Sequence, residues 1–303
     1  LSAADTEQLC DELRQFLVEQ VSRTGGHLAS NLGAVELTVA IHRVFDTASD
    51  RLVFDVGHQC YVHKALTGRR ELFGTLRQFG GLSGFPKPYE SQHDAFMAGH
   101  ASDSVSVALG MARARTLLGQ DYHVLAVIGD GALGGGLSFE GLNDAGGSGE
   151  RLIVVLNDNG MSIDANVGGL SRHLSKVRTT AEYYEFKKKY REALSRLPGG
   201  SALYGLSHEV KTALKKSLLP PVSTMFEDMG FAYMGPVDGH DVARLTAVLQ
   251  AAREEKRPVL VHVHTVKGSG YEPAQREPER FHGVGPFDPV TGREKKAAGE
   301  TFS

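Results

Sequence analysis

The chain has 303 residues, of which 41% are hydrophobic and 23% charged, and its formal net charge is −3. This near-neutral balance gives no support for nucleic-acid binding through charge alone. No apolar run approaches the roughly 20 residues that a membrane span needs, and the N-terminus lacks the apolar core of a signal peptide. The two cysteines, Cys10 and Cys60, are too few for a disulfide framework and suit a reducing compartment, so we expect a cytoplasmic protein.

The predicted elements alternate between helices and strands, in the order typical of an α/β fold. Helical periodicity covers about 5–23, 34–45, 102–118 and 241–254, and a crossover helix is expected within 134–149. Short apolar runs predict strands at about 52–56, 124–128, 152–156, 231–234 and 259–264. We therefore expect one doubly wound domain, with a mostly parallel sheet that is covered by helices on both faces.

Two irregular stretches interrupt this alternation. The segment 80–99 is rich in glycine and proline, and so long a loop in a compact domain is typically functional or mobile. From about 168 to 221 the sequence becomes a basic helical excursion with glycine and proline breaks, for which we expect flexibility. Glutamates interrupt its positive charge and argue against a nucleic-acid arm.

The runs at 124–128 and 152–156 each end in polar residues. Because one helix connects them, they predict a βαβ unit with adjacent, parallel strands. Asp130 and Asn159 then meet beyond the carboxyl ends of the strands, where open α/β sheets bind ligands. A carboxylate and an amide oxygen suit Mg²⁺, which takes its other oxygens from water and substrate phosphates. Gly131 lets a phosphate approach the backbone, so the pattern predicts a metal-bridged diphosphate.

Asp158 is the other acid in this region. Because side chains alternate along a strand, Asp158 points to the opposite face from Asn159 if the strand persists. We therefore expect a structural role for Asp158 and a ligand role for its neighbour.

Three histidines, His27, His58 and His100, each follow a glycine at the end of a predicted element. A lone histidine is more often structural than catalytic. Glycine nevertheless lets a ligand come close, and imidazole accepts or donates a proton near neutrality. We interpret these three histidines as candidate site residues.

The order of these motifs resembles the thiamine diphosphate motif of transketolase-type enzymes, in which GDG is followed after somewhat under thirty residues by an asparagine-containing tail. Longer stretches resemble the 1-deoxy-D-xylulose-5-phosphate synthase family, and the resemblance covers nearly the whole chain. These stretches are GGHLASNLGAVELTVAIH (25–42), FDVGHQCYVHKALTGRR (54–70), GGLSGFPKP (80–88), AGHASDSVSVALGMA (98–112), LNDNGMSI (156–163), GPVDGHD (235–241), KGSGYEPA (267–274) and FHGVGPFDP (281–289).

The resemblance implies a thiamine diphosphate-binding fold and a transferase. Its reaction would decarboxylate pyruvate and condense the remainder with D-glyceraldehyde 3-phosphate to 1-deoxy-D-xylulose 5-phosphate. That product begins non-mevalonate isoprenoid synthesis and supplies thiamine and pyridoxal synthesis. The resemblance further implies thiamine diphosphate and Mg²⁺ as cofactors, a homodimer, and neither a nucleic-acid nor a membrane partner.

Individual roles also follow from the resemblance. Catalytic roles fall on His27 and His282. The implied metal ligands are Asp130, Asn159 and the backbone carbonyl of Met161. The implied cofactor contacts are Ser30, His58, Gly99, His100, Ala101, Gly131, Ala132, Asn159 and Lys267. For Lys267 and His282 the alternative is a solvated or structural loop residue.

Two residues depart from the family pattern. Asp103 stands where the family usually has a small hydroxyl residue, and an acid there is unfavourable beside an anionic cofactor unless it caps the following helix. Gly160 is less restrained than the residue typical of its position. Neither is an implied ligand, so the cofactor prediction stands.

We interpret residues 1–303 as the diphosphate- and Mg²⁺-binding domain alone. In the family a second domain binds the aminopyrimidine ring, and we expect it and a C-terminal domain to be absent from this sequence. The first residue is Leu1 rather than methionine, which suggests a fragment that is inactive by itself. Two alternatives remain open: another transketolase-type ketol transferase, or a non-catalytic diphosphate-binding subunit of a split enzyme.

Overall fold

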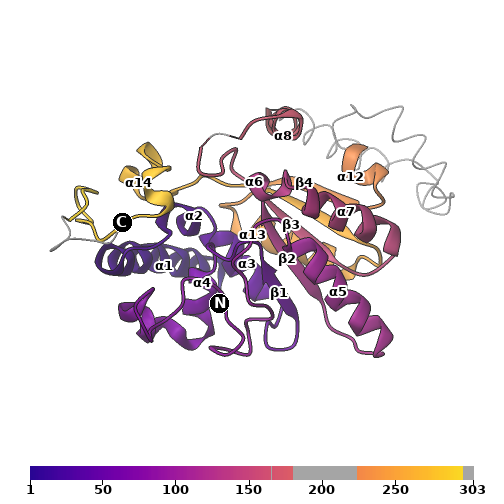
Figure 1. The fold of residues 1–303 in the computed structure, drawn as a ribbon, viewed down its shortest axis with the longest axis horizontal. Helices are drawn as coiled ribbons and strands as arrows, with labels where there is room; N and C mark the ends of the chain where they lie inside the picture. Colours follow the sequence, from indigo (N-terminus) through magenta and orange to yellow (C-terminus); the bar gives the residue numbers. More distant parts are fainter. Residues whose placement is uncertain (165, 180–223, 296–303) are drawn as a thin grey trace.

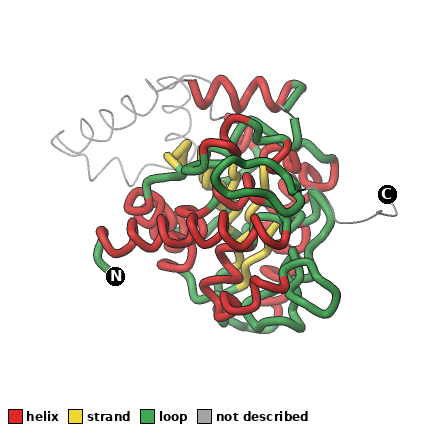
Figure 2. Tube along the Cα trace, turned by 90° about the vertical axis from the view of Figure 1, so that its left-hand side faces the viewer, coloured by secondary structure: helices red, strands yellow, loops and turns green. Residues whose placement is uncertain are grey.

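The computed structural model describes residues 1–164, 166–179 and 224–295, and it shows a sheet between two layers of helices (Figures 1 and 2). The sheet has the order β1-β2-β3-β5-β4, and every neighbouring pair of strands is parallel. Its strands are β1 (Arg51–Phe54), β2 (Val124–Gly129), β3 (Ile153–Asp158), β4 (Ala232–Asp238) and β5 (Val259–His264). The predicted parallel sheet, with β2 and β3 adjacent, is confirmed.

Alternate side chains of each strand enter two separate hydrophobic clusters. In β2, Leu125 and Val127 join one cluster, while Ala126 and Ile128 join the other. Because both faces are buried, the strands appear in the sequence as continuous apolar runs. The first cluster includes residues of α1 (Ala3–Thr24), α3 (Val35–Val44) and α13 (Val242–Glu254), and the second those of α5 (Ser104–Leu117) and α7 (Gly136–Ser148).

Both ends of α1 are defined by specific residues, which fixes the position of the loop that carries His27. A capping box opens the helix, since Ser2 and Asp5 each accept the other's backbone N–H. Gly25 ends it with φ of 73°, a conformation that favours glycine. His27 therefore follows directly from a fixed helix end.

Short helices lie where the sequence predicts loops. The loop predicted around residues 27–33 contains a five-residue helix, α2 (Leu28–Leu32), which is too short for its periodicity to be recognised. The predicted crossover helix is preceded by a separate turn of helix, α6 (Asp130–Leu133). The other short elements are α4 (Tyr61–Lys64), a π-helical turn (Ala65–Arg69), two 3₁₀ turns (Arg70–Thr75 and Arg280–His282), α12 (Thr224–Asp228) and α14 (Glu272–Arg276).

The predicted flexible excursion at about 168–221 is described only at its start, as α8 (Gly169–Thr179). Its remainder, 180–221, lies outside the described residues, so its flexibility stays a prediction. Within the described ranges, every helix is too short or too polar to cross a membrane.

Candidate active site

The predicted metal ligands lie side by side at the carboxyl ends of β2 and β3. Asp130 begins α6 directly after β2, and Asn159 follows β3. One carboxylate oxygen of Asp130 accepts the N–H of Gly160 at 2.7 Å, and the other accepts that of Gly131 at 3.0 Å. The Asn159 side-chain oxygen accepts the N–H of Met161 at 3.0 Å. These contacts join the turn that carries Asp130 to the residues after Asn159, and the ligand role of Asp130 and Asn159 is proposed below.

Asp158 lies closer to this cluster of oxygens than the alternation of the strand predicts. Its carboxylate is fully buried and lies 2.8 Å from Nε2 of His262, whose Nδ1 lies 2.7 Å from the Tyr233 hydroxyl. Burial, followed by hydrogen bonding and charge from Asp158, raises the pKa of Asp130 to about 7. Two neighbouring carboxyl groups repel each other when both are ionised, so a cation bound there stabilises the pair.

Glycine is required at two positions, Gly131 in the turn after β2 and Gly160 in the loop after β3. A Cβ at Gly131 would lie 2.6 Å from Cβ of Ser162, so the absence of a side chain lets the two loops pack closely. Gly160 has φ of 76°, a left-handed conformation that glycine adopts without strain.

The segment 99–102 lies across the ends of β1 and β2. Gly99, His100 and Ala101 are exposed. The His100 carbonyl accepts the N–H of Val56 at 3.0 Å. The Ser102 hydroxyl donates to the Ala132 carbonyl at 2.7 Å. The segment thereby joins the loop after β1 to the turn that carries Asp130. The cofactor contacts implied at 99–101 and at 132 are therefore neighbours, while their role stays a prediction.

Three histidines from distant parts of the chain form a cluster. The ring centroids of His27 and His58 are 5.6 Å apart, those of His27 and His282 are 5.8 Å apart, and those of His58 and His282 are 5.2 Å apart. The Ser30 hydroxyl lies 3.3 Å from Nδ1 of His282. An antiparallel bridge between Gly26 and Val284 joins the segment before His27 to the segment after His282. His100 lies outside this cluster.

Burial keeps the clustered imidazoles neutral. It lowers the pKa of His27 to about 4, with smaller effects from the charges of Arg77 and His282. It likewise lowers the pKa of His58 to about 3. Within the part of the chain that the structure describes, Nδ1 of both rings is buried without a hydrogen-bond partner. Buried polar atoms are normally hydrogen-bonded, so these two nitrogens indicate a site for a polar ligand.

Lys267 connects the histidine cluster to the loop that carries Asn159. The side chain is only 6% exposed, and Nζ donates to the Ser162 carbonyl at 2.5 Å. The alternative of a solvated loop lysine is therefore wrong. Burial lowers the pKa of Lys267, while its charge lowers the pKa of His58 and of His282.

Asn31 holds two of these histidines together, although nothing in its local sequence marked it as a site residue. Asn31 is fully buried, and its amide donates to the carbonyls of His27 and His58 at 2.6 and 2.7 Å. Its oxygen accepts the N–H of Tyr61 at 2.8 Å, and the Tyr61 hydroxyl accepts that of His27. Arg77, whose charge acts on His27, was also missed. In the sequence, Arg77 could have been noticed only as a basic residue just before a glycine-rich loop.

The condition under which an acid at position 103 suits an anionic cofactor, that it caps the following helix, is not met. Asp103 occupies the N-cap position of α5 but makes no capping bond with its side chain. Asp55, at the end of β1, accepts the N–H groups of Ser102 and Ser104 at 2.8 and 3.1 Å. Burial and the nearby charge of Asp55 raise the pKa of Asp103. Asp55, which is distant in sequence, therefore accepts N–H groups at the start of α5 that a cap would otherwise accept.

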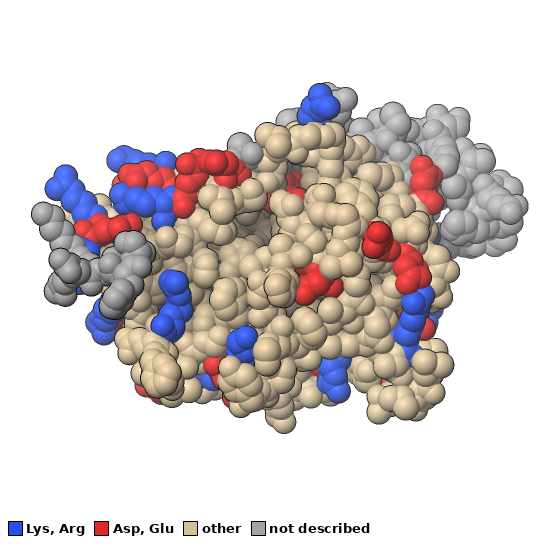
Figure 3. Space-filling model, in the orientation of Figure 1, with Lys and Arg blue, Asp and Glu red and all other residues tan. Residues whose placement is uncertain are grey.

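A hollow in the surface lies between α2, which follows His27, and α6, which begins at Asp130 (Figure 3). Few charged side chains surround it on this face. The exposed apolar side chains Leu137, Ile163 and Val266 follow the carboxyl ends of strands on the same edge of the sheet.

Comparison with known proteins gives the family. The profile described as 1-deoxy-D-xylulose-5-phosphate synthase matches residues 1–265. The chain belongs to this family. It is 55% identical over 296 residues to the 1-deoxy-D-xylulose-5-phosphate synthase of Pelotomaculum thermopropionicum, covering 98% of the chain and 46% of the relative. The corresponding enzyme of Natranaerobius thermophilus is 53% identical over 299 residues, with 98% and 47% covered. The chain thus spans about half the length of the curated relatives it matches.

Solved structures agree on the fold. The transketolase of Campylobacter jejuni superposes with a TM-score of 0.67 at 20% identity, over 95% of this chain and 41% of that one. The transketolase of Leishmania mexicana superposes with a TM-score of 0.66 at 19% identity, over 95% and 41%. At these identities the likeness establishes the fold alone.

Proposed function

We propose that the complete protein condenses pyruvate, with loss of CO₂, and D-glyceraldehyde 3-phosphate to 1-deoxy-D-xylulose 5-phosphate. The observation that carries this proposal is the acid pair at the ends of β2 and β3 beside three clustered histidines, within a chain 55% identical to a synthase of that name. The product is the precursor that non-mevalonate isoprenoid, thiamine and pyridoxal synthesis require.

The described residues fit thiamine diphosphate and Mg²⁺. The raised pKa of Asp130 next to Asp158 indicates a place for a cation. Asp130, Asn159 and the Met161 carbonyl would hold Mg²⁺, whose remaining ligands come from the diphosphate and water. Bound thiamine diphosphate supplies the nucleophilic carbon and the electron sink that decarboxylation of a 2-oxo acid needs.

The protein's own groups would bind the cofactor and move protons. Ser30, His58, Gly99, His100, Ala101, Gly131, Ala132, Asn159 and Lys267 form the cofactor-binding set. His27 and His282 are neutral at pH 7, so each can donate or accept a proton at substrate oxygens. The buried ammonium of Lys267 stabilises negative charge between the diphosphate loop and the histidines.

The remaining domains of the same enzyme would complete the active site. The apolar side chains at the strand ends give those domains a surface to cover, and a homodimer is the expected assembly. Cys10 and Cys60 are both free and buried, which fits a reducing cytoplasm. We expect neither nucleic-acid nor membrane partners. The domain described here, isolated from the rest, would bind half of the cofactor and have little activity.

The test is an assay of the full-length protein with thiamine diphosphate and Mg²⁺. Pyruvate and D-glyceraldehyde 3-phosphate should yield CO₂ and 1-deoxy-D-xylulose 5-phosphate, detected by mass spectrometry. A parallel reaction with a ketose phosphate donor tests the transketolase alternative. Ketol transfer from that donor, without CO₂ release from pyruvate, would refute the proposal.

A further inference from the structure

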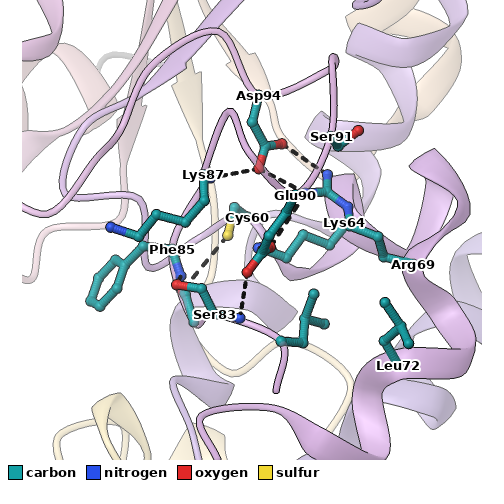
Figure 4. Close-up of polar contacts among 12 residues, drawn as sticks. Cys60, Lys64, Arg69, Leu72, Ser83, Phe85, Lys87, Glu90, Ser91 and Asp94 are labelled. Carbon is teal, nitrogen blue, oxygen red and sulfur yellow. Dashed lines mark hydrogen bonds and ion pairs between the residues drawn. The ribbon is translucent and has the colours of Figure 1, made fainter. Parts of the chain in front are cut away.

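Four charged side chains are buried between α4, the turn after it and the loop that contains residues 83–94 (Figure 4). Lys64 and Asp94 have side chains that are 0% exposed, and those of Arg69 and Glu90 are 5% and 14% exposed. Burying charges is costly even when they are paired, and hydrophobic replacements are often at least as stable. Stability alone therefore does not explain this cluster.

Asp94 joins the helical turn to the backbone of the loop. Its two oxygens accept both ends of the Arg69 guanidinium, at 2.7 and 2.8 Å. The same carboxylate accepts the N–H of Lys87 at 2.7 Å and lies 3.0 Å from Nε2 of His63. The planar, bidentate Arg69 pair fixes the carboxylate in orientation as well as position. The backbone at residue 87 is thereby fixed to the turn.

Glu90 makes the same kind of connection four residues earlier in the loop. Its carboxylate accepts from Nζ of Lys64 and, at 2.8 Å, from the N–H of Ser83. Between the two anchored positions, Sγ of Cys60 lies 3.7 Å from the Gly84 carbonyl. Each acid thus binds a cation of the helical segment and one backbone N–H of the loop, and Arg69 also lies 3.7 Å from Glu90. The segment 83–87 is anchored at both ends.

The anchored segment forms a wall of the histidine cluster. The ring of Phe85, which points away from the ion pairs in Figure 4, lies 5.8 Å from that of His27. A Cβ at Gly57 would lie 2.6 Å from Cδ of Pro86, so the segment also packs tightly against the residue before His58. A displacement of this wall would leave space for the His27 imidazole to rotate.

We propose that Asp94 and Glu90 are positioning residues. By anchoring residues 83–87 to α4 and the turn after it, they hold Phe85 against the His27 ring and Pro86 against Gly57, and so fix the orientation of the His27 imidazole for proton transfer. This inference rests on the proposed function, because it concerns a histidine that acts in it. A misplacement of about 1 Å caused by a remote mutation can cost ~10²-fold in rate.

The test uses full-length enzyme with Asp94→Ala, Asp94→Asn and Glu90→Gln. Asp121→Asn is the matched control, because it removes one charge from an exposed ion pair with Arg151. Turnover number, the dissociation constant of thiamine diphosphate in Mg²⁺, and hydrogen exchange of the 83–87 amides are measured for each. Asp94→Asn and Glu90→Gln keep an acceptor for the loop N–H and the side-chain volume, so they test the inference if Asp94→Ala does not fold.

Asp94→Ala should lower the turnover number ~10- to 10²-fold, with the cofactor dissociation constant changed less than about threefold and exchange accelerated at 83–87. Asp94→Asn and Glu90→Gln should lose less turnover, and Asp121→Asn none. Unchanged turnover in all three loop variants, or a cofactor affinity that falls as much as turnover, would overturn the inference. Unchanged exchange at 83–87 in Asp94→Ala would also overturn it. Absence of product from the unmodified enzyme would instead refute the proposed function, while the exchange measurement still tests the anchoring.

Discussion

Removal of the Asn31 side chain should destabilise the fold and the site together. In Asn31→Ala, the carbonyls of His27 and His58 lose a donor, and the N–H of Tyr61 loses its acceptor. Asn31 is 0% exposed, so water reaches these groups only if the structure opens. Three hydrogen bonds at about 1 kcal/mol each give a loss of about 3 kcal/mol, and more where a buried group stays unpaired.

Scanning calorimetry of the full-length protein measures this loss. A cost of about 3 kcal/mol corresponds to a fall in Tm of roughly 5 °C for the transition of a domain of about 300 residues. Asn143→Ala is the matched control, because Asn143 is exposed on α7 and its replacement should change the free energy of unfolding by less than about 0.5 kcal/mol. A loss in Asn31→Ala no larger than in the control would refute the reasoning.

The other predictions concern individual site residues in the complete enzyme. His27→Ala should lower turnover ~10²–10⁴-fold with little change in cofactor affinity, and equal losses of both would make His27 a binding residue. Asp130→Ala should abolish Mg²⁺-dependent binding of thiamine diphosphate, while Asp158→Ala has the smaller effect. Calorimetric titration of each variant decides this, since equal losses mean that the wrong acid was chosen. Because the pKa of Asp130 is raised to about 7, its carboxylate is mostly protonated at pH 6 and mostly ionised at pH 8. Mg²⁺ affinity should therefore rise about tenfold from pH 6 to pH 8. Asp158→Ala removes the neighbouring charge and should flatten this dependence, whereas ionisation of the phosphate ligand would leave the slope unchanged.

The sheet was predictable because strands that are buried on both faces appear in the sequence as continuous apolar runs. The runs that become β2 and β3 are apolar at nearly every position, and polar residues follow each of them, Asp130 after one and Asn157 to Asn159 after the other. The order of the strands was less accessible. β5 lies between β3 and β4, and only tertiary contacts place it there.

The candidate site was predictable where function falls on a motif and not where it depends on contacts. His27, His58 and Asp130 were recognisable from their glycine neighbours and from the resemblance. Asn31 was not, because its role depends on two loops 27 residues apart meeting at one amide group. Asp55 likewise accepts the N–H of Ser104 at the start of α5, although the two residues lie 49 positions apart in the sequence. Local sequence carries no record of such pairings.

The bridge between Gly26 and Val284 has a consequence for synthesis of the protein. These residues exchange two hydrogen bonds, of 2.8 and 3.0 Å, across 284 − 26 = 258 positions of the chain. Translation at roughly 5–20 residues per second separates their emergence from the ribosome by about 13–50 s. During that interval β1, β2 and β3 can pair, but the His27 loop has no His282 segment to pack against. The nascent domain can therefore pair β1, β2 and β3 well before its imidazole cluster can close, whereas β5 emerges only shortly before His282.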